Sequence, residues 1–402
     1  MSLSTTDHRS SEQTHTNFTA AAVVYLDALR ACAANWVVLA HMLAFFELRW
    51  WKYQSGSLGV VVFFLLSGFL ISQSMLKRQH GPGPRFGGFL ADRVARIMTP
   101  YVPALLLVAA IDALFLSARF GGNGVSSGPM ALLGNLFMLE DYPLFQLAEV
   151  GGVRLDWRIR PYNSAEPFWT VAIEMWIYVA TGLLFFWLFL NEPLKRRWLL
   201  PLLCLSLPVL VWNAAAGPGK SLSLIWLAGA LAGVVLAPLP RRLGRGRCRM
   251  TAVGMLSVGV VALFGHVRKY GFDAYNLQTA CLIALIMFAP FLYLQTLQNP
   301  PPAAAKLWMS LAAYSYSLYL IHNTAIAVVW SAQDGKPTTA ALLSCIALAH
   351  VLALVLYWAF ERHYRLVGRW LRPRFEHALS APAGHAAAVR AATPSSIDRP
   401  LG

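Results

Sequence analysis

Long apolar stretches, separated by short polar loops, follow one another along most of this chain. Many of them approach or exceed the ~20 residues that an α-helix needs to cross the hydrocarbon core of a bilayer. The pattern predicts an all-α polytopic membrane protein with about ten transmembrane helices. The ten stretches are residues 21–46, 58–76, 100–117, 168–190, 198–213, 221–237, 251–266, 277–296, 309–331 and 338–360.

The loops between these stretches differ in charge, because Lys and Arg are concentrated in every second loop. Positively charged loops stay on the cytosolic side, so the pattern predicts cytosolic N- and C-termini in a bacterial inner (plasma) membrane. The composition agrees with this, since 57% of the residues are hydrophobic and 13% are charged, about half the charged share of soluble domains. The net charge of +15 then reflects topology, and membrane lipids rather than nucleic acid are the expected surroundings.

The chain is expected to have three regions: a polar N-terminal tail (1–20), a transmembrane domain (21–366) and a basic, disordered C-terminal tail (367–402). The longest external loop, 118–167, contains a short apolar piece at 130–139 and elsewhere mixes acids, aromatic residues and arginines. Loops of this length are often functional. The loop therefore either contacts a polar, ring-shaped acceptor or is a solvated connector.

The five cysteines lack metal-ligand spacing, and the chain has no P-loop, dinucleotide fingerprint or H-E-x-x-H motif. These features predict no metal site, no disulfide framework and no tightly bound cofactor. Redox chemistry and ATP hydrolysis have no support in the sequence.

Charged and titratable side chains interrupt the first apolar stretch. A charge inside a spanning helix costs at least ~2.5 kcal/mol on insertion scales, so it is expected to have a partner and a function. Asp27 lies one turn before Arg30, and His41 lies eleven positions after Arg30, in nearly the same direction and ~16 Å farther along the axis. We expect an acid, a cation and a base on one helix face. The alternatives are an ion pair that only anchors the helix and a hydrogen-bonded core histidine.

Arg93 and Arg96 form an R-x-x-R pattern on a predicted helix near the cytosolic membrane surface. Two guanidinium groups on one helix face can bind a phosphate group. The same pattern is also typical of an ordinary cluster of cytosolic positive charge, and the spacing does not separate these alternatives.

Three further polar positions lie within apolar stretches. Glu174 needs a cation or a proton to be stable there. His322 shares a helical stripe with Ser315 and Tyr319, which favours either catalysis or hydrogen bonds between helices. Ser67 has small and apolar neighbours but lacks the G-x-S-x-G elbow of serine hydrolases.

Six segments, taken in order, resemble motifs of the acyltransferase 3 family of integral membrane O-acyltransferases. They are YLDALRACAANWVVLAH (25–41), FFLLSGFLIS (63–72), RVARIMTPYVPAL (93–105), PFWTVAIEMWIYV (167–179), YSYSLYLIHN (314–323) and FERHYR (360–365). The resemblance implies ten core helices, an acyl-CoA donor taken from the cytosol and an acceptor hydroxyl, usually on a sugar, at the opposite face. It also implies that His41 is the catalytic base and that Arg30, Arg93 and Arg96 serve the donor or the pore.

We therefore expect an O-acyltransferase that moves an acyl group, above all acetyl, from acetyl-CoA as co-substrate to a surface glycan or a lipid-linked sugar. The expected catalytic residues are Glu174 and His41, with His322 in support of His41. The residues expected to bind acyl-CoA or line its pore are Asp27, Arg30, Ser67, Arg93 and Arg96. The alternative is a multipass transporter or flippase with an intramembrane charge pathway, against which the lack of internal repeats argues.

Overall fold

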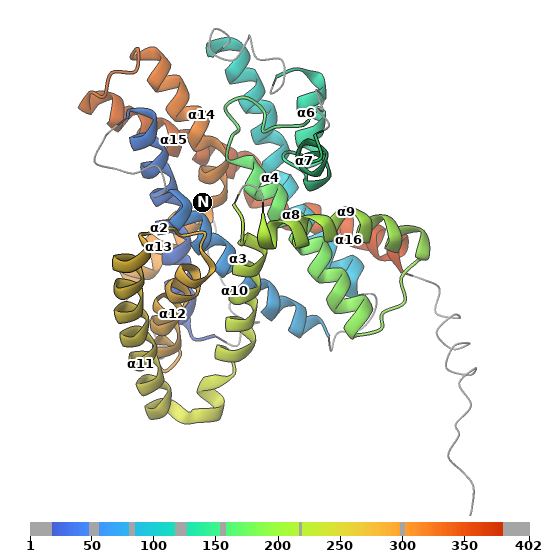
Figure 1. Ribbon diagram of the computed structural model, residues 1–402, viewed down its shortest axis with the longest axis vertical. Helices are drawn as coiled ribbons and strands as arrows, with labels where there is room; N and C mark the ends of the chain where they lie inside the picture. Colours follow the sequence, from blue (N-terminus) through green and yellow to red (C-terminus); the bar gives the residue numbers. More distant parts are fainter. Residues whose placement is uncertain are drawn as a thin grey trace, which may run out of the picture.

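The computed structural model describes residues 18–47, 56–79, 85–116, 127–152, 158–216, 219–297 and 302–380. Within these ranges the regular structure is helical, apart from one isolated β-bridge between Leu194 and Ser380. The prediction of an all-α protein is thereby confirmed. The helices are α2 (Ala20–Phe45), α3 (Gly56–Arg78), α4 (Arg85–Phe115), α6 (Pro129–Leu136), α7 (Pro143–Val150), α8 (Phe168–Leu183) with the π-helical η2 (Leu184–Phe189), α9 (Arg196–Ala215), α10 (Leu222–Leu236), α11 (Leu239–Tyr270), α12 (Leu277–Leu294), α13 (Pro302–Ala313), α14 (Ser315–Ala332), α15 (Thr339–Ala359), the 3-10 helix η3 (Glu361–His363) and α16 (Tyr364–Leu379) (Figure 1).

Eight helical segments in the described part of the chain are long and apolar enough to cross a membrane, so the chain is a polytopic membrane protein. Helix α10 is apolar but has only 15 residues. The stretch expected at 309–331 is divided into α13 and α14, because the backbone of Tyr314 (φ −108°, ψ 11°) departs from helical geometry. The Ser315 hydroxyl donates to Ala312 O at 2.8 Å across this break, and such bonds compete with the helical ladder.

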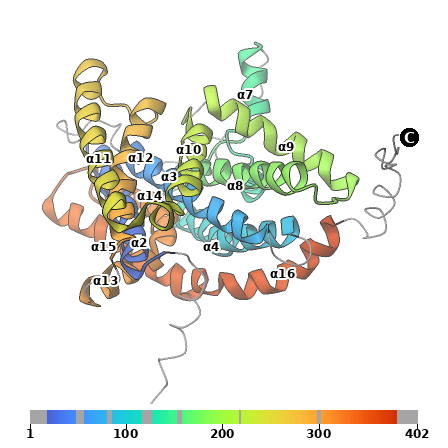
Figure 2. The same cartoon turned by 90° about the horizontal axis from the view of Figure 1, so that it is seen from below.

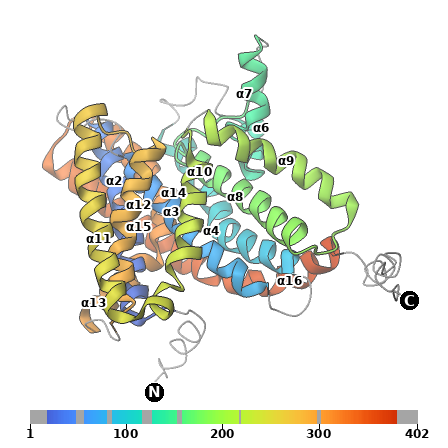
Figure 3. The same cartoon turned by 60° about the horizontal axis from the view of Figure 1, so that its bottom comes forward.

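Helices α3 and α14 join the two sides of the molecule. On one side lie α2, α11, α12, α13 and α15, and on the other lie α4, α8, α9 and α16 (Figure 3). Helix α3 packs on α2 and α12 of the first group and on α8 of the second, and α14 packs on α2 and α15 but also on α4. A site built from α3 and α14 is therefore lined by helices of both groups.

Glycines let α3 and α10 approach each other closely. A Cβ atom at Gly68 would lie 2.0 Å from Trp226 O, and one at Gly229 would lie 2.2 Å from Leu65 O. Contacts this short exclude any side chain, so the small residues permit backbone-to-backbone packing of two spanning helices. This packing brings the indole of Trp226 to the Ser67 hydroxyl on α3, where Nε1 donates at 3.0 Å.

Helix α16 packs along α4 (Figure 2). The Asp92 carboxylate accepts hydrogen bonds from Arg78 of α3 and, at 3.0 Å, from Arg372 of α16. A Cβ atom at Gly87 would lie 2.8 Å from the Glu376 backbone, so the two helices touch through a glycine.

Helix α16 extends the described structure beyond the domain boundary expected at residue 366. It continues to Leu379. The reason is tertiary: the basic sequence of this segment is neutralised in part by Asp92, a residue about 280 positions earlier in the chain. Residues 381–402 lie outside the described ranges.

Helices α6 and α7 form much of the described part of loop 118–167. The Asn135 side chain organises this region, because its amide donates to Ala131 O at 2.9 Å and to Arg160 O at 2.8 Å while its oxygen accepts from Tyr162 N at 3.0 Å. A single buried amide thus joins the two ends of the loop. Contact between this loop and an acceptor stays a prediction.

Glu140, which follows α6, is a buried acid with an unusual neighbour. The Tyr101 hydroxyl lies 2.9 Å from Glu140 Oε1 and also 2.9 Å from Asn135 O. A phenol has one proton, and a carbonyl can only accept it. The single phenol proton is therefore shared between these two acceptors. Burial raises the pKa of Glu140 to about 8, against the lowering effect of the hydrogen bond from Tyr101.

We expect Glu140→Gln to change how stability depends on pH. The pKa of Glu140 is 4.5 in the unfolded chain and about 8 in the folded protein. As the pH rises from 4.5 to about 8, the free energy of unfolding of the wild type should therefore fall relative to that of the variant. The slope of this difference is at most ~1.4 kcal/mol per pH unit. Melting temperatures in detergent from pH 5 to 9 measure it, with Glu47→Gln, an exposed carboxylate, as the control. Parallel melting profiles of wild type and Glu140→Gln would contradict the assignment.

Candidate active site

The two predicted histidines meet between α2 and α14. His41 Nδ1 lies 3.0 Å from His322 Nε2, and the ring centroids are 4.9 Å apart. His322 is fully buried, whereas His41 is partly exposed. The partly exposed ring is therefore the one that a substrate can reach.

The hydrogen bonds of His322 define which nitrogen of His41 is free. His322 Nδ1 lies 2.7 Å from Tyr319 O, and a carbonyl can only accept, so Nδ1 carries the proton. In a neutral imidazole the other nitrogen, Nε2, is then an acceptor. His41 Nδ1 must donate to it, which leaves His41 Nε2 unprotonated. The pair is thus arranged as a base oriented by a second histidine, which is in turn oriented by a backbone carbonyl.

A glycine faces the unprotonated nitrogen of His41. A Cβ atom at Gly56, the first residue of α3, would lie 3.5 Å from His41 Nε2. A larger side chain in this position would occupy the space in front of the base. The glycine keeps that space available.

A cavity approaches the histidine pair between α2, α3, α4, α8 and α14. On α2 its lining includes Arg30, eleven positions before His41, and on α14 it includes Ser315 and Tyr319, seven and three positions before His322. Both helices thus run from the cavity towards the pair. At 1.5 Å per residue, the Arg30 end lies ~16 Å from the His41 end.

Helix α3 runs in the opposite direction along the same cavity, because its first residue, Gly56, lies beside His41. The lining residues Val60 and Phe63 are therefore nearer to the histidines than Ser67 is. The cavity accordingly has an arginine end, a hydroxyl-rich middle and an aromatic end next to the histidine pair.

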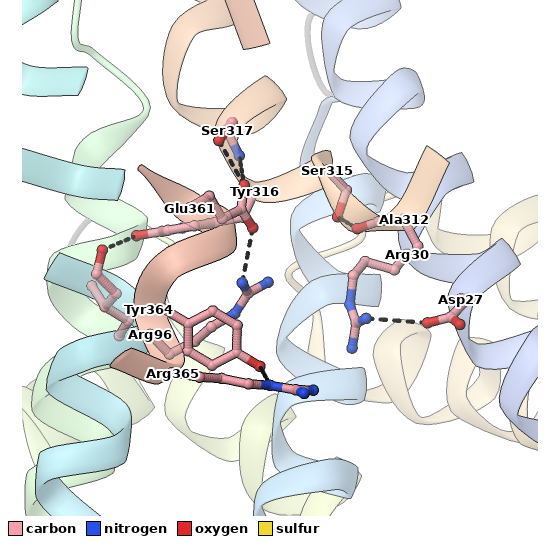
Figure 4. A network of polar contacts seen from close by, with 11 residues as sticks. Asp27, Arg30, Arg96, Ala312, Ser315, Tyr316, Ser317, Glu361, Tyr364 and Arg365 are labelled. Atoms are coloured by element: carbon pink, nitrogen blue, oxygen red, sulfur yellow. Dashed lines mark hydrogen bonds and ion pairs between the residues drawn. The ribbon is translucent and has the colours of Figure 1, made fainter. Parts of the chain in front are cut away.

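All three predicted arginines line the cavity, and two of them form ion pairs with carboxylates of the protein. Arg30 contacts Asp27 at 3.3 Å, as its position one turn away predicted, and Arg96 contacts Glu361 at 2.9 Å (Figure 4). Glu361 also accepts from Ser317 N at 3.1 Å and from its hydroxyl at 2.6 Å. The Arg96 pair therefore joins α4 to η3, and Glu361 joins η3 to α14.

Arg93 differs from Arg96 although both belong to the R-x-x-R pattern. Its Nε atom is buried and makes no hydrogen bond to any residue that the structure describes. No ion pair joins it to a described carboxylate. Arg93 thus interacts with Glu174 across the cavity without forming an ion pair, whereas Arg96 is paired directly with Glu361.

Glu174 and Ser67 are joined through a residue that sequence reasoning missed. The Tyr178 hydroxyl donates to Glu174 Oε1 at 2.5 Å and lies 2.7 Å from the Ser67 hydroxyl. Since Tyr178 has one proton, Ser67 donates to it and accepts from Trp226 Nε1 at 3.0 Å. Glu174, Ser67 and Tyr178 all line the cavity. Tyr178 lies four positions after Glu174, and this spacing is the only sequence signal that could have revealed the contact.

A second network ties loop 118–167 to α14 beside the histidine pair. Asp112 accepts from the Ser164 hydroxyl at 2.6 Å and from its backbone N–H at 3.1 Å. Ser164 also contacts the Thr324 hydroxyl at 2.7 Å, and its carbonyl accepts from Asn323 at 2.9 Å. The end of the loop is thus fixed directly after His322.

Comparison with protein families finds a match over most of the chain. The sequence profile of a family described as Acyltransferase domain, Acyl_transf_3, matches residues 23–358. The chain belongs to the acyltransferase 3 family. No curated protein and no solved structure matched it. This protein is therefore a membrane acyltransferase, and the match includes all eight residues expected at its site.

In this acyltransferase, Arg96→Ala should lower stability far more than Arg93→Ala. The first change leaves Glu361, whose side chain is 1% exposed, without its cation, and breaking one side of a buried pair costs ~3 kcal/mol. Arg93 has no ion pair to lose among the described residues. Thermal unfolding of the detergent-solubilised variants measures the difference. Glu361→Ala in the Arg96→Ala background should recover part of the loss, and equal melting shifts for the two single variants would overturn this distinction.

Proposed function

We propose that this acyltransferase transfers an acetyl group from cytosolic acetyl-CoA to a hydroxyl of a surface glycan or lipid-linked sugar at the external face. The observation that carries the proposal is the polarity of the cavity. Cationic side chains lie at one end and the oriented His41–His322 pair lies beyond the other. A donor with anionic phosphates, a long polar arm and a terminal thioester matches this order of groups.

Each part of the cavity has chemistry that suits one part of such a donor. The guanidinium groups of Arg93 and Arg30 suit phosphate oxygens. The Ser67 hydroxyl, whose proton is directed to Tyr178, offers an acceptor to an amide N–H of the pantetheine arm. The side chains of Val60, Phe63 and Tyr319 at the aromatic end suit a small apolar acyl group. Glu174 then acts through Tyr178, as a residue that orients Ser67.

His41 is proposed to act as the general base. Its Nε2 atom removes the proton of the acceptor hydroxyl, whose oxygen attacks the thioester carbonyl carbon. The C–S bond breaks, and the CoA thiolate takes up the proton from the His41 imidazolium directly or through water. General-base catalysis of this kind contributes ~10²–10⁴-fold. His322 keeps His41 in the required tautomer, in the way that an orienting partner does in other base-assisted transfers.

The decisive experiment is acyl transfer by the purified protein in lipid nanodiscs. Acetyl-CoA is supplied with surface polysaccharide and lipid-linked sugars extracted from the host, and free CoA and acetylated sugar are measured by mass spectrometry. Equal molar release of CoA and appearance of acetylated sugar is expected. A transporter or flippase would leave acetyl-CoA intact, and that result would overturn the proposal.

His41→Gln should abolish transfer while the protein still inserts and folds. Gln keeps hydrogen-bonding atoms but cannot accept the proton, and replacing one polar group in a span by another does not impair insertion. His322→Ala should retain measurable activity, because His41 keeps its free nitrogen but loses its orienting partner. Rates of acetyl transfer by the two variants, measured at matched protein levels, test both expectations. If His41→Gln retained more than a few per cent of wild-type activity while His322→Ala lost all of it, the base would have to be His322.

Arg93→Ala should raise the KM for acetyl-CoA with little change in the KM for the sugar. A charge-assisted hydrogen bond contributes ~1.5–3 kcal/mol, so the donor KM should rise by tenfold or more. Arg374→Ala removes an exposed arginine of α16 that does not line the cavity, and it serves as the matched control. An unchanged donor KM in Arg93→Ala would place the donor phosphates elsewhere.

A further inference from the structure

The ring of Tyr319 stands between the cavity and the histidine pair. Tyr319 lines the cavity, whereas neither His41 nor His322 is among the described residues that line it. The Tyr319 and His322 ring centroids are 5.6 Å apart, one helical turn along α14. Any group that travels from the arginine end towards His41 therefore meets this phenol first.

The Tyr319 ring is fixed rather than free to swing aside. Its hydroxyl lies 2.5 Å from Thr170 Oγ1, and the Thr170 hydroxyl donates to Pro167 O at 2.9 Å. The Tyr319 hydroxyl also donates to Pro167 O at 3.3 Å, so the two hydroxyls and this carbonyl form one hydrogen-bonded group. The opposite side of the phenol is held by Phe63, whose ring is 5.7 Å away in an edge-on arrangement. Tyr319 is 6% exposed, so solvent does not compete for these contacts.

This arrangement leaves little room beyond the thioester. In the proposed binding mode the donor arm passes beside Ser67, and the acyl group lies against the packed rings of Phe63 and Tyr319 to present its carbonyl carbon to the acceptor next to His41. Each additional methylene would press against one of these fixed rings. Aromatic rings held by packing and hydrogen bonds move only at a cost in free energy.

We propose that Tyr319, fixed by Thr170, sets the upper limit on acyl-chain length in this enzyme. The inference rests on the proposed function, because it assigns the acyl end of the donor to the aromatic end of the cavity. It makes Tyr319 a specificity-determining residue and Thr170 a positioning residue. The substrate class that follows is a short-chain acyl thioester.

The test compares acetyl-CoA, butyryl-CoA and hexanoyl-CoA as donors, with polysaccharide and lipid-linked sugars extracted from the host as acceptors. Tyr319→Ala should raise the ratio of kcat/KM for butyryl-CoA to that for acetyl-CoA by ~10-fold or more, the discrimination that one or two methylenes usually carry. Thr170→Val removes the shorter of the two hydrogen bonds of the ring, Tyr319→Phe removes both, and each variant keeps the ring. Both should raise the ratio in the same direction by a smaller factor than Tyr319→Ala.

Tyr314→Phe is the matched control, because Tyr314 is a buried tyrosine of the same region whose hydroxyl contacts His350 at 3.1 Å and which does not line the cavity. It should leave the chain-length ratio at the wild-type value. If Tyr319→Ala does not fold, Thr170→Val and Tyr319→Phe decide the question. If these variants keep wild-type activity and an unchanged ratio of butyryl-CoA to acetyl-CoA use, the role of Tyr319 in chain length is overturned, and the proposed function is not. Wild-type protein that cleaves none of the three thioesters in the presence of acceptors would overturn the proposed function as well.

Discussion

The hydrogen bond between His41 and His322 is the contact on which the site depends. It links residues 281 positions apart and requires α2 and α14 to run side by side in the same direction with a fixed register. Polar groups inside an apolar span are stable only with partners, so each imidazole stabilises the other. The Tyr319 carbonyl then determines the tautomer of both rings. A backbone atom of α14 thereby leaves a free nitrogen on α2, facing the space that Gly56 keeps open.

The same requirement for partners divides the arginines of the cavity into two kinds. Arg30 and Arg96 are neutralised by Asp27 and Glu361, so their charges are part of the structure. Arg93 has a buried Nε without a hydrogen bond to the described residues, and it interacts with Glu174 without forming an ion pair. Two arginines of one short motif therefore have different roles in the packing of the protein.

The sequence by itself determined the helical class, the membrane location of the chain and its family. Each follows from information along one helix or from the order of motifs. Apolar length is sufficient to specify a spanning helix, since backbone polar groups in lipid must be satisfied within the segment. The contact of Asp27 with Arg30 was predictable for the same reason, because two residues one turn apart on a helix are neighbours whatever surrounds them. The shared helix face of Arg30 and His41 was expected from their spacing, whereas a common site for His41, His322, Glu174 and the other arginines was expected only from their resemblance to the family motifs.

Only the tertiary structure decided which helix faces meet and at which register. The π-helical end of α8, the break at Tyr314 and the continuation of α16 to Leu379 depend on packing and on contacts such as that of Arg372 with Asp92. The bond between Tyr319 and Thr170 likewise joins residues 149 positions apart. An apolar helix surface has nearly the same hydrophobicity in every direction, so the pattern along the chain does not reveal which face is turned inward. That choice is made by close packing of small residues and by the pairing of buried polar groups, and both exist only after the helices have come together.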